Sequence, residues 1–173
     1  GNQDIKTHNL QQLRENIGVV PQDPFLFSDT IENNIQFGKS DATKDEIIQA
    51  TKDADVHNNI IQFKKGYKTV LGERGVTLSG GQKQRVSIAR AIIKNPQIVL
   101  FDDCLSAVDT ETEETILNNL KRVTKNSTTI IVSHRISSAK NADTIFILDK
   151  GSIIQKGTHK ELLNTSGYYK ELH

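Results

Sequence analysis

The residues with the clearest chemical potential form a short turn, Ser79, Gly80 and Gly81, directly before an expected helix. Glycine has no Cβ, so backbone N–H groups at this turn can come close to a phosphate. The N-terminus of the helix adds a favourable dipole for an anion, and Ser79 supplies a hydroxyl donor. Taken alone, a Ser-Gly-Gly turn is more often an ordinary helix cap than a binding site.

Two carboxylates, Asp102 and Asp103, follow the apolar segment 98–101, which predicts a buried strand. Carboxylates at the end of such a strand could hold a nucleotide-bound Mg²⁺, directly or through water. A helix N-cap or a solvated pair is the plainer alternative. A second apolar segment, 128–133, delivers His134 at its own end. One His and two Asp at adjacent strand ends favour a phosphate site.

Apolar strands alternating with amphipathic helices must position these side chains. Strands are predicted over residues 17–20, 98–101, 128–133, 144–148 and 152–155, and helices from residue 43 for about three turns, around residues 56–61, over 82–94, from 110 and from 158. Thr43, Thr110 and Thr158 each begin a Thr-x-x-Glu capping pattern, whereas a loop is expected from Gln22 onward. The alternation predicts an α/β fold with a parallel sheet, in which ligands bind beyond the carboxyl ends of the strands.

The composition narrows the classes of function. The 173 residues fit one compact domain, and 22 Lys and Arg against 21 Asp and Glu leave a net charge of +1. This balance argues against nucleic acid as a partner. No apolar stretch approaches the roughly 18 residues that a membrane-spanning helix needs, and the single cysteine, Cys104, fits the reducing cytosol. The chain contains no Met, so we expect a fragment or a processed piece of a longer protein.

In their order and spacing, these motifs resemble the nucleotide-binding domain of ABC transporters of the exporter type. The matching positions are Gln22 for the Q-loop, residues 69–75 for the X-loop, 78–82 for the signature motif, 98–102 for Walker B, 106–109 for the D-loop and His134 for the switch histidine. The resemblance runs from about Leu13 to the C-terminus. Each short motif is a weak signal, but the ordered set is specific.

The resemblance implies a partial P-loop NTPase (RecA-like) fold, with a parallel sheet core and an inserted α-helical subdomain. Residues 1–173 would form a single ABC ATPase domain fragment. Within it, about 1–40 would be the Q-loop part of the core, about 41–95 the helical subdomain with the signature motif, and about 96–173 the core with Walker B, the D-loop and the switch histidine.

In this family two such domains close head to tail around two ATP molecules, and each site combines residues of both. By resemblance, the side that contacts the nucleotide held by the partner domain comprises Ser79, Gly80, Gly81, Gln82 and, at the domain interface, Asp109. Of these residues, Ser79, Gly80 and Gly81 would contact the γ-phosphate of ATP across the interface.

The chain's own site would use a different set of residues. Asp102 and Gln22 would bind Mg²⁺, and Gln22 would also sense the attacking water. Asp103 stands at the position of the general base, and His134 would contact the γ-phosphate. Glu73 and the loop 22–29 would face the transmembrane domain.

The implied function is that of the ATP-binding and ATP-hydrolysing domain of a membrane exporter, at the cytoplasmic face of the cell membrane. ATP-driven closure of the domain dimer would be coupled to export of a drug-, lipid- or peptide-like substrate. The abundance of Ile, Lys and Asn suggests a bacterial source. One alternative is a regulatory ATP-binding half that lends its signature loop to a catalytic partner. A soluble ABC ATPase is the other, which residues 69–75 disfavour.

One departure from the family pattern is the absence of the phosphate-binding G-x-x-x-x-G-K-[ST] loop. Residues 37–40 only imitate it, because Asn33 stands five residues before Gly38 and no apolar strand leads in. Lys39 is therefore interpreted as a solvated loop residue. We expect this piece alone to bind ATP poorly and to be inactive. In the family the missing strand lies beside the strand that leads to His134, so exposed strand edges predict self-association.

A second departure is Asp103, where competent family members usually carry Glu. Asp is shorter by one C–C bond, roughly 1.5 Å, and a misplacement near 1 Å can cost on the order of 100-fold in rate. The chain's own site is therefore expected to be slow. An intact signature loop beside a weak base is similar to the degenerate-site subunit of a heterodimeric exporter, so the partner domain is expected to belong to a different subunit.

Overall fold

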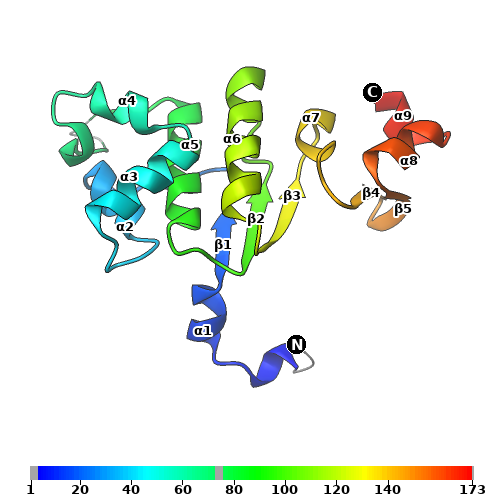
Figure 1. Cartoon of the computed structure of the whole chain (residues 1–173), viewed down its shortest axis with the longest axis horizontal. Helices are drawn as coiled ribbons and strands as arrows, with labels where there is room; N and C mark the ends of the chain where they lie inside the picture. Colours follow the sequence, from blue (N-terminus) through cyan, green and yellow to red (C-terminus); the bar gives the residue numbers. More distant parts are fainter. Residues whose placement is uncertain (1–3, 73–75, 173) are drawn as a thin grey trace. The chain divides into compact units, whose positions relative to one another are not determined.

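The computed structural model of the chain describes residues 4–72 and 76–172. The chain divides into two compact units, Gly1–Val132 and Ser133–His173 (Figure 1). The first unit contains a parallel sheet with most of the helices, and the second contains a β-hairpin with short helices.

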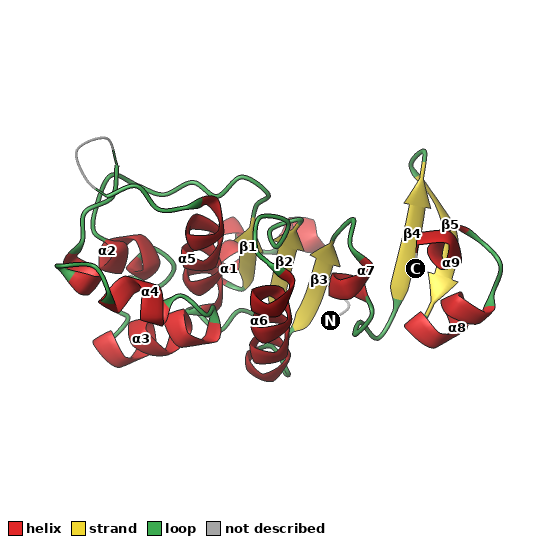
Figure 2. Ribbon diagram, turned by 90° about the horizontal axis from the view of Figure 1, so that it is seen from above, coloured by secondary structure: helices red, strands yellow, loops and turns green. Residues whose placement is uncertain are grey.

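Three parallel strands form the sheet of the first unit: β1 (Ile17–Val20), β2 (Ile98–Asp102) and β3 (Thr128–Val132). They lie in the order β1-β2-β3 (Figure 2). Val20 pairs with Phe101, and Asp102 pairs with Val132. The carboxyl ends of all three strands therefore meet at one edge of the sheet. The α/β class and the parallel sheet predicted from the sequence are confirmed.

Helices occupy most of the remaining first unit. They are η1 (Ile5–Thr7), α1 (Leu10–Glu15), α2 (Ile31–Gln36), α3 (Lys44–Asp53), α4 (His57–Ile61), η2 (Gly66–Lys68), α5 (Gly80–Ile92) and α6 (Thr110–Val123). Val20, Val99 and Phe101 of the sheet share one buried apolar cluster with Val86 of α5 and Ile116 of α6. Burial of this cluster anchors α5 and α6 to the sheet.

Side-chain caps set where several helices begin. Thr43 caps α3 in a complete capping box with Glu46, as the sequence predicts. At α6 the cap is Asp109, whose carboxylate accepts the N–H of Thr112, so the predicted cap at Thr110 is wrong. Thr110 is instead the first helical residue.

Helix α2 corrects the expected loop after Gln22. Thr30 caps it by accepting the N–H of Asn33 through its hydroxyl, and Ile31 and Ile35 are fully buried. Six residues make less than two helical turns, too few for a clear periodic pattern in the sequence. Tertiary burial, rather than local propensity, stabilises this helix.

In the second unit, β4 (Ile145–Asp149) and β5 (Ser152–Gly157) pair antiparallel with each other, not with the parallel sheet. The connecting residues Lys150 and Gly151 both have positive φ, 47° and 79°, as a tight two-residue hairpin turn requires.

Helices complete the second unit. They are α7 (Ile136–Ala139), α8 (His159–Asn164) and α9 (Tyr168–Leu172). Thr158 caps α8 in a capping box with Glu161, as predicted. Ile145, Leu162 and Tyr169 form the small core.

Candidate functional site

Gln22 and Asp102 lie at the carboxyl ends of two neighbouring parallel strands. Asp102 is the last residue of β2, and Gln22 follows the end of β1 by two residues. Because Val20 pairs with Phe101, both side chains emerge at the same edge of the sheet, and both residues are exposed. Ligands of parallel α/β sheets bind at this edge.

Asp103 turns the chain sharply away from β2. Its φ is +43°, in the left-handed region, where Asp is among the few residues found with any frequency. Its N–H donates to the carbonyl of Val132 at 2.9 Å, and its own carbonyl accepts from the Ser106 hydroxyl at 2.9 Å. The conformation is therefore fixed from both sides, and it begins the segment that leads to Asp109.

Cys104 follows this turn and is buried. Burial, with smaller contributions from the nearby carboxylates of Asp103 and Asp102, raises the pKa of its thiol to about 12. The thiol therefore stays protonated near neutral pH, which does not suit a nucleophile or a metal ligand.

The Ser-Gly-Gly turn begins the 13-residue helix α5. The Ser79 hydroxyl accepts the N–H of Gln82 at 3.2 Å, and the Gln82 side-chain oxygen accepts the N–H of Ser79 at 3.0 Å. This capping box lets α5 start at Gly80, two residues before the start predicted from the sequence. Ser79 and Gly80 are exposed.

Gly80 and Gly81 differ in how much space their surroundings leave for a side chain. A Cβ on Gly81 would lie 3.1 Å from the carbonyl oxygen of Ala107 and 3.3 Å from Val108, so close packing restricts this position. A Cβ on Gly80 would have its nearest neighbour, the Cβ of Ala107, at 3.9 Å. The packing of the described residues leaves Gly80 free to be larger. Packing within the described residues therefore does not account for glycine at this position.

Asp109 lies at the start of α6 and accepts the N–H of Thr112 at 2.9 Å. Hydrogen bonds from Thr112 hold the pKa of this carboxylate below its usual range, and Arg85 of α5 adds a smaller effect. The segment 106–109 thus packs beside Gly81 and ends in a helix cap. The cap explains Asp109 structurally, and an additional role at a domain interface stays a prediction.

Gln84 is a residue that the sequence interpretation missed. It lies on α5, it is only 3% exposed, and its side-chain amide donates to the backbone carbonyl of Gln22 at 3.3 Å. This bond connects the helix of the Ser-Gly-Gly turn to the loop after β1. A polar residue among the apolar positions of a predicted amphipathic helix was the available signal.

His134 is exposed and lies in the second unit, two residues after the end of β3 along the chain. Glu73 falls within residues 73–75, outside the described part of the structure. Lys39 is not simply solvated, because its ammonium forms an ion pair with Glu46 at 2.5 Å. The segment before Gly38 is α2, so no strand leads into it and the P-loop imitation is indeed false.

Phe25, Phe27 and Phe37 form an aromatic patch that the sequence interpretation also missed. The rings of Phe25 and Phe27 meet edge to face at 5.1 Å, and those of Phe27 and Phe37 lie 4.8 Å apart. The guanidinium of Arg90 lies 5.5 Å from the Phe27 ring centroid. Phe25 and Phe37 are 66% and 67% exposed. Three Phe within 13 residues were the signal.

The strand-end residues fit a magnesium ion in their donor chemistry. Mg²⁺ prefers oxygen ligands and is usually held by one or two carboxylates together with substrate phosphates and water. The Asp102 carboxylate and the Gln22 amide oxygen offer such a set. Across residues 4–72 and 76–172, no three His, Cys, Asp or Glu side chains gather into a metal site of their own. The protein would therefore supply only part of the coordination shell.

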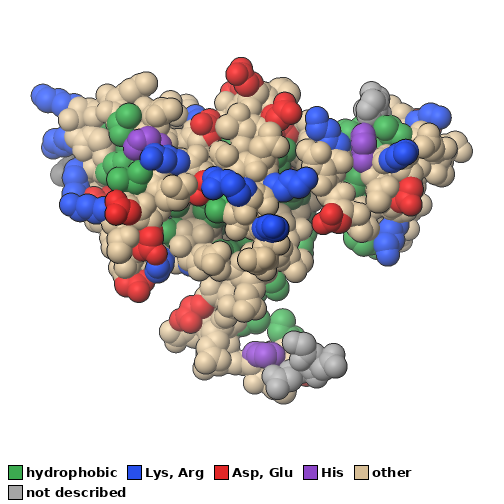
Figure 3. All heavy atoms as spheres, in the orientation of Figure 1, with side chains coloured by type: hydrophobic (Ala, Val, Ile, Leu, Met, Phe, Trp, Pro, Cys, Tyr) green, Lys and Arg blue, Asp and Glu red, His purple; other side chains and the backbone are tan. Residues whose placement is uncertain are grey.

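Basic and acidic side chains are interspersed on much of the face seen in Figure 3. None of the helices in the described residues combines the length and the apolar character that a membrane crossing requires.

The sequence profile of the ABC transporter family matches residues 1–106. Since this is more than half of the 173 residues, the chain belongs to the ABC transporter family. The resemblance inferred from its motifs is confirmed.

The chain is 54% identical over 169 residues to an uncharacterized ABC transporter ATP-binding protein of Bacillus subtilis, YknU. It is 53% identical over 167 residues to ATP-binding cassette sub-family B member 6 of Xenopus tropicalis. These alignments cover 98% and 96% of the chain but 29% and 20% of the two relatives.

Among solved structures, a bacterial Atm1-family ABC exporter with ATP bound matches 98% of the chain and 30% of its own length. The TM-score is 0.92 and the sequence identity is 45%. The chain therefore has the fold of an ABC exporter's ATP-binding part and spans less than a third of the proteins it matches.

Proposed function

We propose that this chain is part of the ATP-binding and ATP-hydrolysing domain of a membrane exporter, at the cytoplasmic face of the membrane. One observation carries the proposal: Gln22 and Asp102 emerge at the same edge of neighbouring parallel strands. Gln84 connects the Gln22 loop to the helix whose exposed N-terminus holds Gly80. The expected division into a core with an inserted helical subdomain, residues 41–95, belongs to this proposal.

The Ser-Gly-Gly turn would bind phosphate across an interface with a second ABC ATPase domain. Ser79 and Gly80 are exposed at the N-terminus of a long helix, and the fold itself does not require glycine at Gly80. An approaching γ-phosphate would meet backbone N–H groups and the helix dipole there. Gln82 holds the turn in shape through the capping box. Asp109, which caps α6 near Gly81, would line the same interface.

The strand-end residues would serve the chain's own nucleotide. Asp102 would hold Mg²⁺, whose charge offsets that of the phosphates. Gln22 would add its amide oxygen as a further ligand and orient the attacking water. Asp103 would accept a proton from that water. His134 would donate a hydrogen bond to the γ-phosphate. In α/β proteins, nucleotide sites are typically built from residues at the carboxyl ends of neighbouring strands.

The aromatic patch would contact the transmembrane domain. Phe25 and Phe27 belong to the loop 22–29, and both rings are exposed although they are apolar. Exposed aromatic clusters beside a structured loop are typical of protein interfaces. This contact would transmit nucleotide-driven movement of the Gln22 loop to the export of a drug-, lipid- or peptide-like substrate.

The test is Mg²⁺-dependent ATP hydrolysis by the full-length protein carrying Asp102→Asn. We expect hydrolysis to fall at least about 100-fold, since a preorganised charge at the reacting phosphates is removed. Asp149→Asn is the matched control, because Asp149 also ends a strand but lies on the hairpin. Equal hydrolysis in the Asp102 variant and the control would overturn the proposal.

A second candidate function rests on Asp103. Its short carboxylate favours a slow site in a chain that lends its signature turn to a different, catalytic subunit. In the full-length protein with its partner, Asp103→Glu should raise turnover at this site, and Asp103→Asn should change total turnover little. The φ of +43° is less favourable for Glu than for Asp. The unfolding temperature of each variant must therefore be measured together with its ATP turnover, so that a loss of folding is not taken for a loss of catalysis. A well-folded Glu variant without any gain would count against this candidate.

A further inference from the structure

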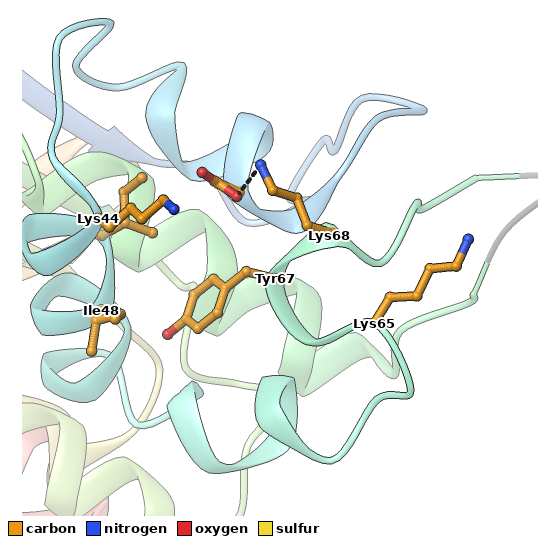
Figure 4. Close-up of a pocket in the computed structure, with 7 residues that line it drawn as sticks. Lys44, Ile48, Lys65, Tyr67 and Lys68 are labelled. Atoms are coloured by element: carbon orange, nitrogen blue, oxygen red, sulfur yellow. Dashed lines mark ion pairs between the residues drawn. The ribbon is translucent and has the colours of Figure 1, made fainter.

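A cavity of about 210 Å³ lies within the first unit, away from the strand ends. Its walls come from α2, α3 and the turn η2 (Figure 4). An engineered apolar cavity of about 150 Å³ accommodates benzene. The size therefore suits one six-membered ring with a small substituent.

The apolar wall of the cavity is preformed. Ile48 of α3 and the ring of Tyr67 face the space. The Tyr67 hydroxyl forms hydrogen bonds with the Thr51 hydroxyl at 2.5 Å and with Nδ1 of His57 at 2.8 Å. These two bonds fix the ring from behind, so little conformational freedom would be lost on binding.

The rim of the cavity is cationic. Among residues 4–72 and 76–172, three lysines (Lys44, Lys65 and Lys68) and one acidic residue, Glu32, line the cavity, so these side chains carry a net charge of +2. Glu32 is engaged by Lys68 at 2.7 Å. In the described part of the chain, Lys44 and Lys65 take part in no ion pair. In Figure 4, Lys44 extends toward the space beside the Tyr67 ring, whereas Lys65 extends outward.

We propose that this cavity binds a small single-ring organic anion, such as an aryl phosphate or aryl carboxylate. The ring would lie against Tyr67 and Ile48, and the anionic group would lie at the rim beside Lys44, with Lys65 able to close over it. A neutral ring would leave the lysines unpaired, and a bare phosphate would leave the apolar wall unfilled. Both features together therefore define the class of ligand.

The test is calorimetric titration of the protein with phenyl phosphate, with inorganic phosphate and benzyl alcohol as partial ligands. We expect a dissociation constant on the order of a millimolar or tighter for phenyl phosphate. Both partial ligands should bind at least about 10-fold more weakly. Added salt should weaken the phenyl phosphate titration, because the rim charges are exposed.

The site is tested with Lys44→Gln/Lys65→Gln against the matched pair Lys52→Gln/Lys64→Gln. Lys52 is also exposed on α3, and Lys64 adjoins Lys65, but neither lines the cavity. Only the first pair should weaken phenyl phosphate binding, by about 10-fold or more, with unfolding temperatures unchanged. Equal weakening in both pairs, no binding by the parent protein, or inorganic phosphate binding as tightly as phenyl phosphate would each overturn the proposal.

Discussion

The guanidinium of Arg90 donates to both carbonyl groups of Asn34, at 2.7 Å to the backbone oxygen and at 2.9 Å to the side-chain oxygen. Asn34 in turn accepts the N–H of Phe27 at 2.8 Å and donates to the carbonyl of Phe27 at 3.0 Å. Arg90 also donates to the carbonyl of Phe25 at 2.7 Å. One arginine on α5 therefore holds the aromatic loop and α2 in place.

Replacing Arg90 should destabilise the first unit. Arg90→Met removes the arginine donor from the backbone carbonyl of Asn34 and leaves the Asn34 side-chain oxygen with only the N–H of Phe27. We therefore expect a loss of about 2–4 kcal/mol in the free energy of unfolding. Arg90→Lys should recover only a small part, because an ammonium does not reproduce the planar fork of donors. Denaturant unfolding measures both. Lys83→Met, on the same helix, is the control and should cost less than about 1 kcal/mol.

The ion pair of Lys39 and Glu46 predicts a pH dependence. The hydrogen bond from Lys39, aided by the N–H of Thr43, lowers the pKa of Glu46 from 4.5 to about 2. A lowered folded-state pKa stabilises the protein above the unfolded value, and that stabilisation is lost as pH falls. Glu46→Gln keeps the capping box and removes the charge. The stability difference between parent and variant should be constant above about pH 5 and shrink between pH 4.5 and 2.

This pH test has an internal control. Lys39→Met/Glu46→Gln should be no less stable than Glu46→Gln at any pH, since the charge of Lys39 has lost its partner. A stability difference that persists unchanged at pH 2 would show that the ion pair is not its cause.

The free side of β3 predicts association between copies of the chain. In the described sheet β3 pairs with β2 on one side only, and Ile130 and Val132 are 48% and 46% exposed. Unpaired strand edges with apolar side chains recruit further strands. Sedimentation velocity should show oligomers of the 173-residue chain that Ile130→Lys reduces. Ile61→Lys, at an exposed apolar residue on α4, should not reduce them. A monomer with a cooperative thermal transition would contradict this prediction.

We expect a substitution in the aromatic patch to leave the stability of the first unit unchanged and to impair coupling to the transmembrane domain. Phe25→Ser removes a ring that is 66% exposed, so the unfolding temperature of the first unit should change by less than about 3 °C. ATP hydrolysis in the full-length protein should lose its response to transported substrate. A similar serine substitution at Phe146, exposed on β4, is the control. Unchanged substrate stimulation in Phe25→Ser would argue against contact between the patch and the transmembrane domain.

The parts of the fold that follow local rules were predictable from the sequence. The apolar segments of β1, β2 and β3 and the capping boxes of α3 and α8 occur where the sequence places them. Helix α2 was not predictable from local sequence, since its stability comes from burial of Ile31 and Ile35. The sequence places the cap of α6 one residue too late because Asp109 and Thr110 are both good caps. Only the hydrogen bond from the N–H of Thr112 to the Asp109 carboxylate decides between them.

In the candidate site, too, some features were predictable from the sequence and others depend on long-range contacts. Gln22 and Asp102 lie at one sheet edge because their strands run parallel, which the alternation of strands and helices predicts. The order of the strands is a finding of the structure. The bonds made by Gln84 and Arg90 join segments 62 and 56 residues apart, to Gln22 and Asn34 respectively. Such long-range contacts leave no local pattern in the sequence. The positive φ of Asp103 likewise depends on its bond to Val132 of the neighbouring strand.

The most direct test of the account is ATP hydrolysis by the full-length protein carrying Gly80→Ala. A Cβ fits at this position within the chain, and Ala favours a helix over Gly by up to about 1 kcal/mol, so stability should be unchanged or slightly raised. The added methyl would keep a phosphate from the backbone N–H groups, so hydrolysis should fall by about 10- to 100-fold. A stable Gly80→Ala protein that hydrolyses ATP at the parent rate would contradict the assignment of this turn to phosphate binding.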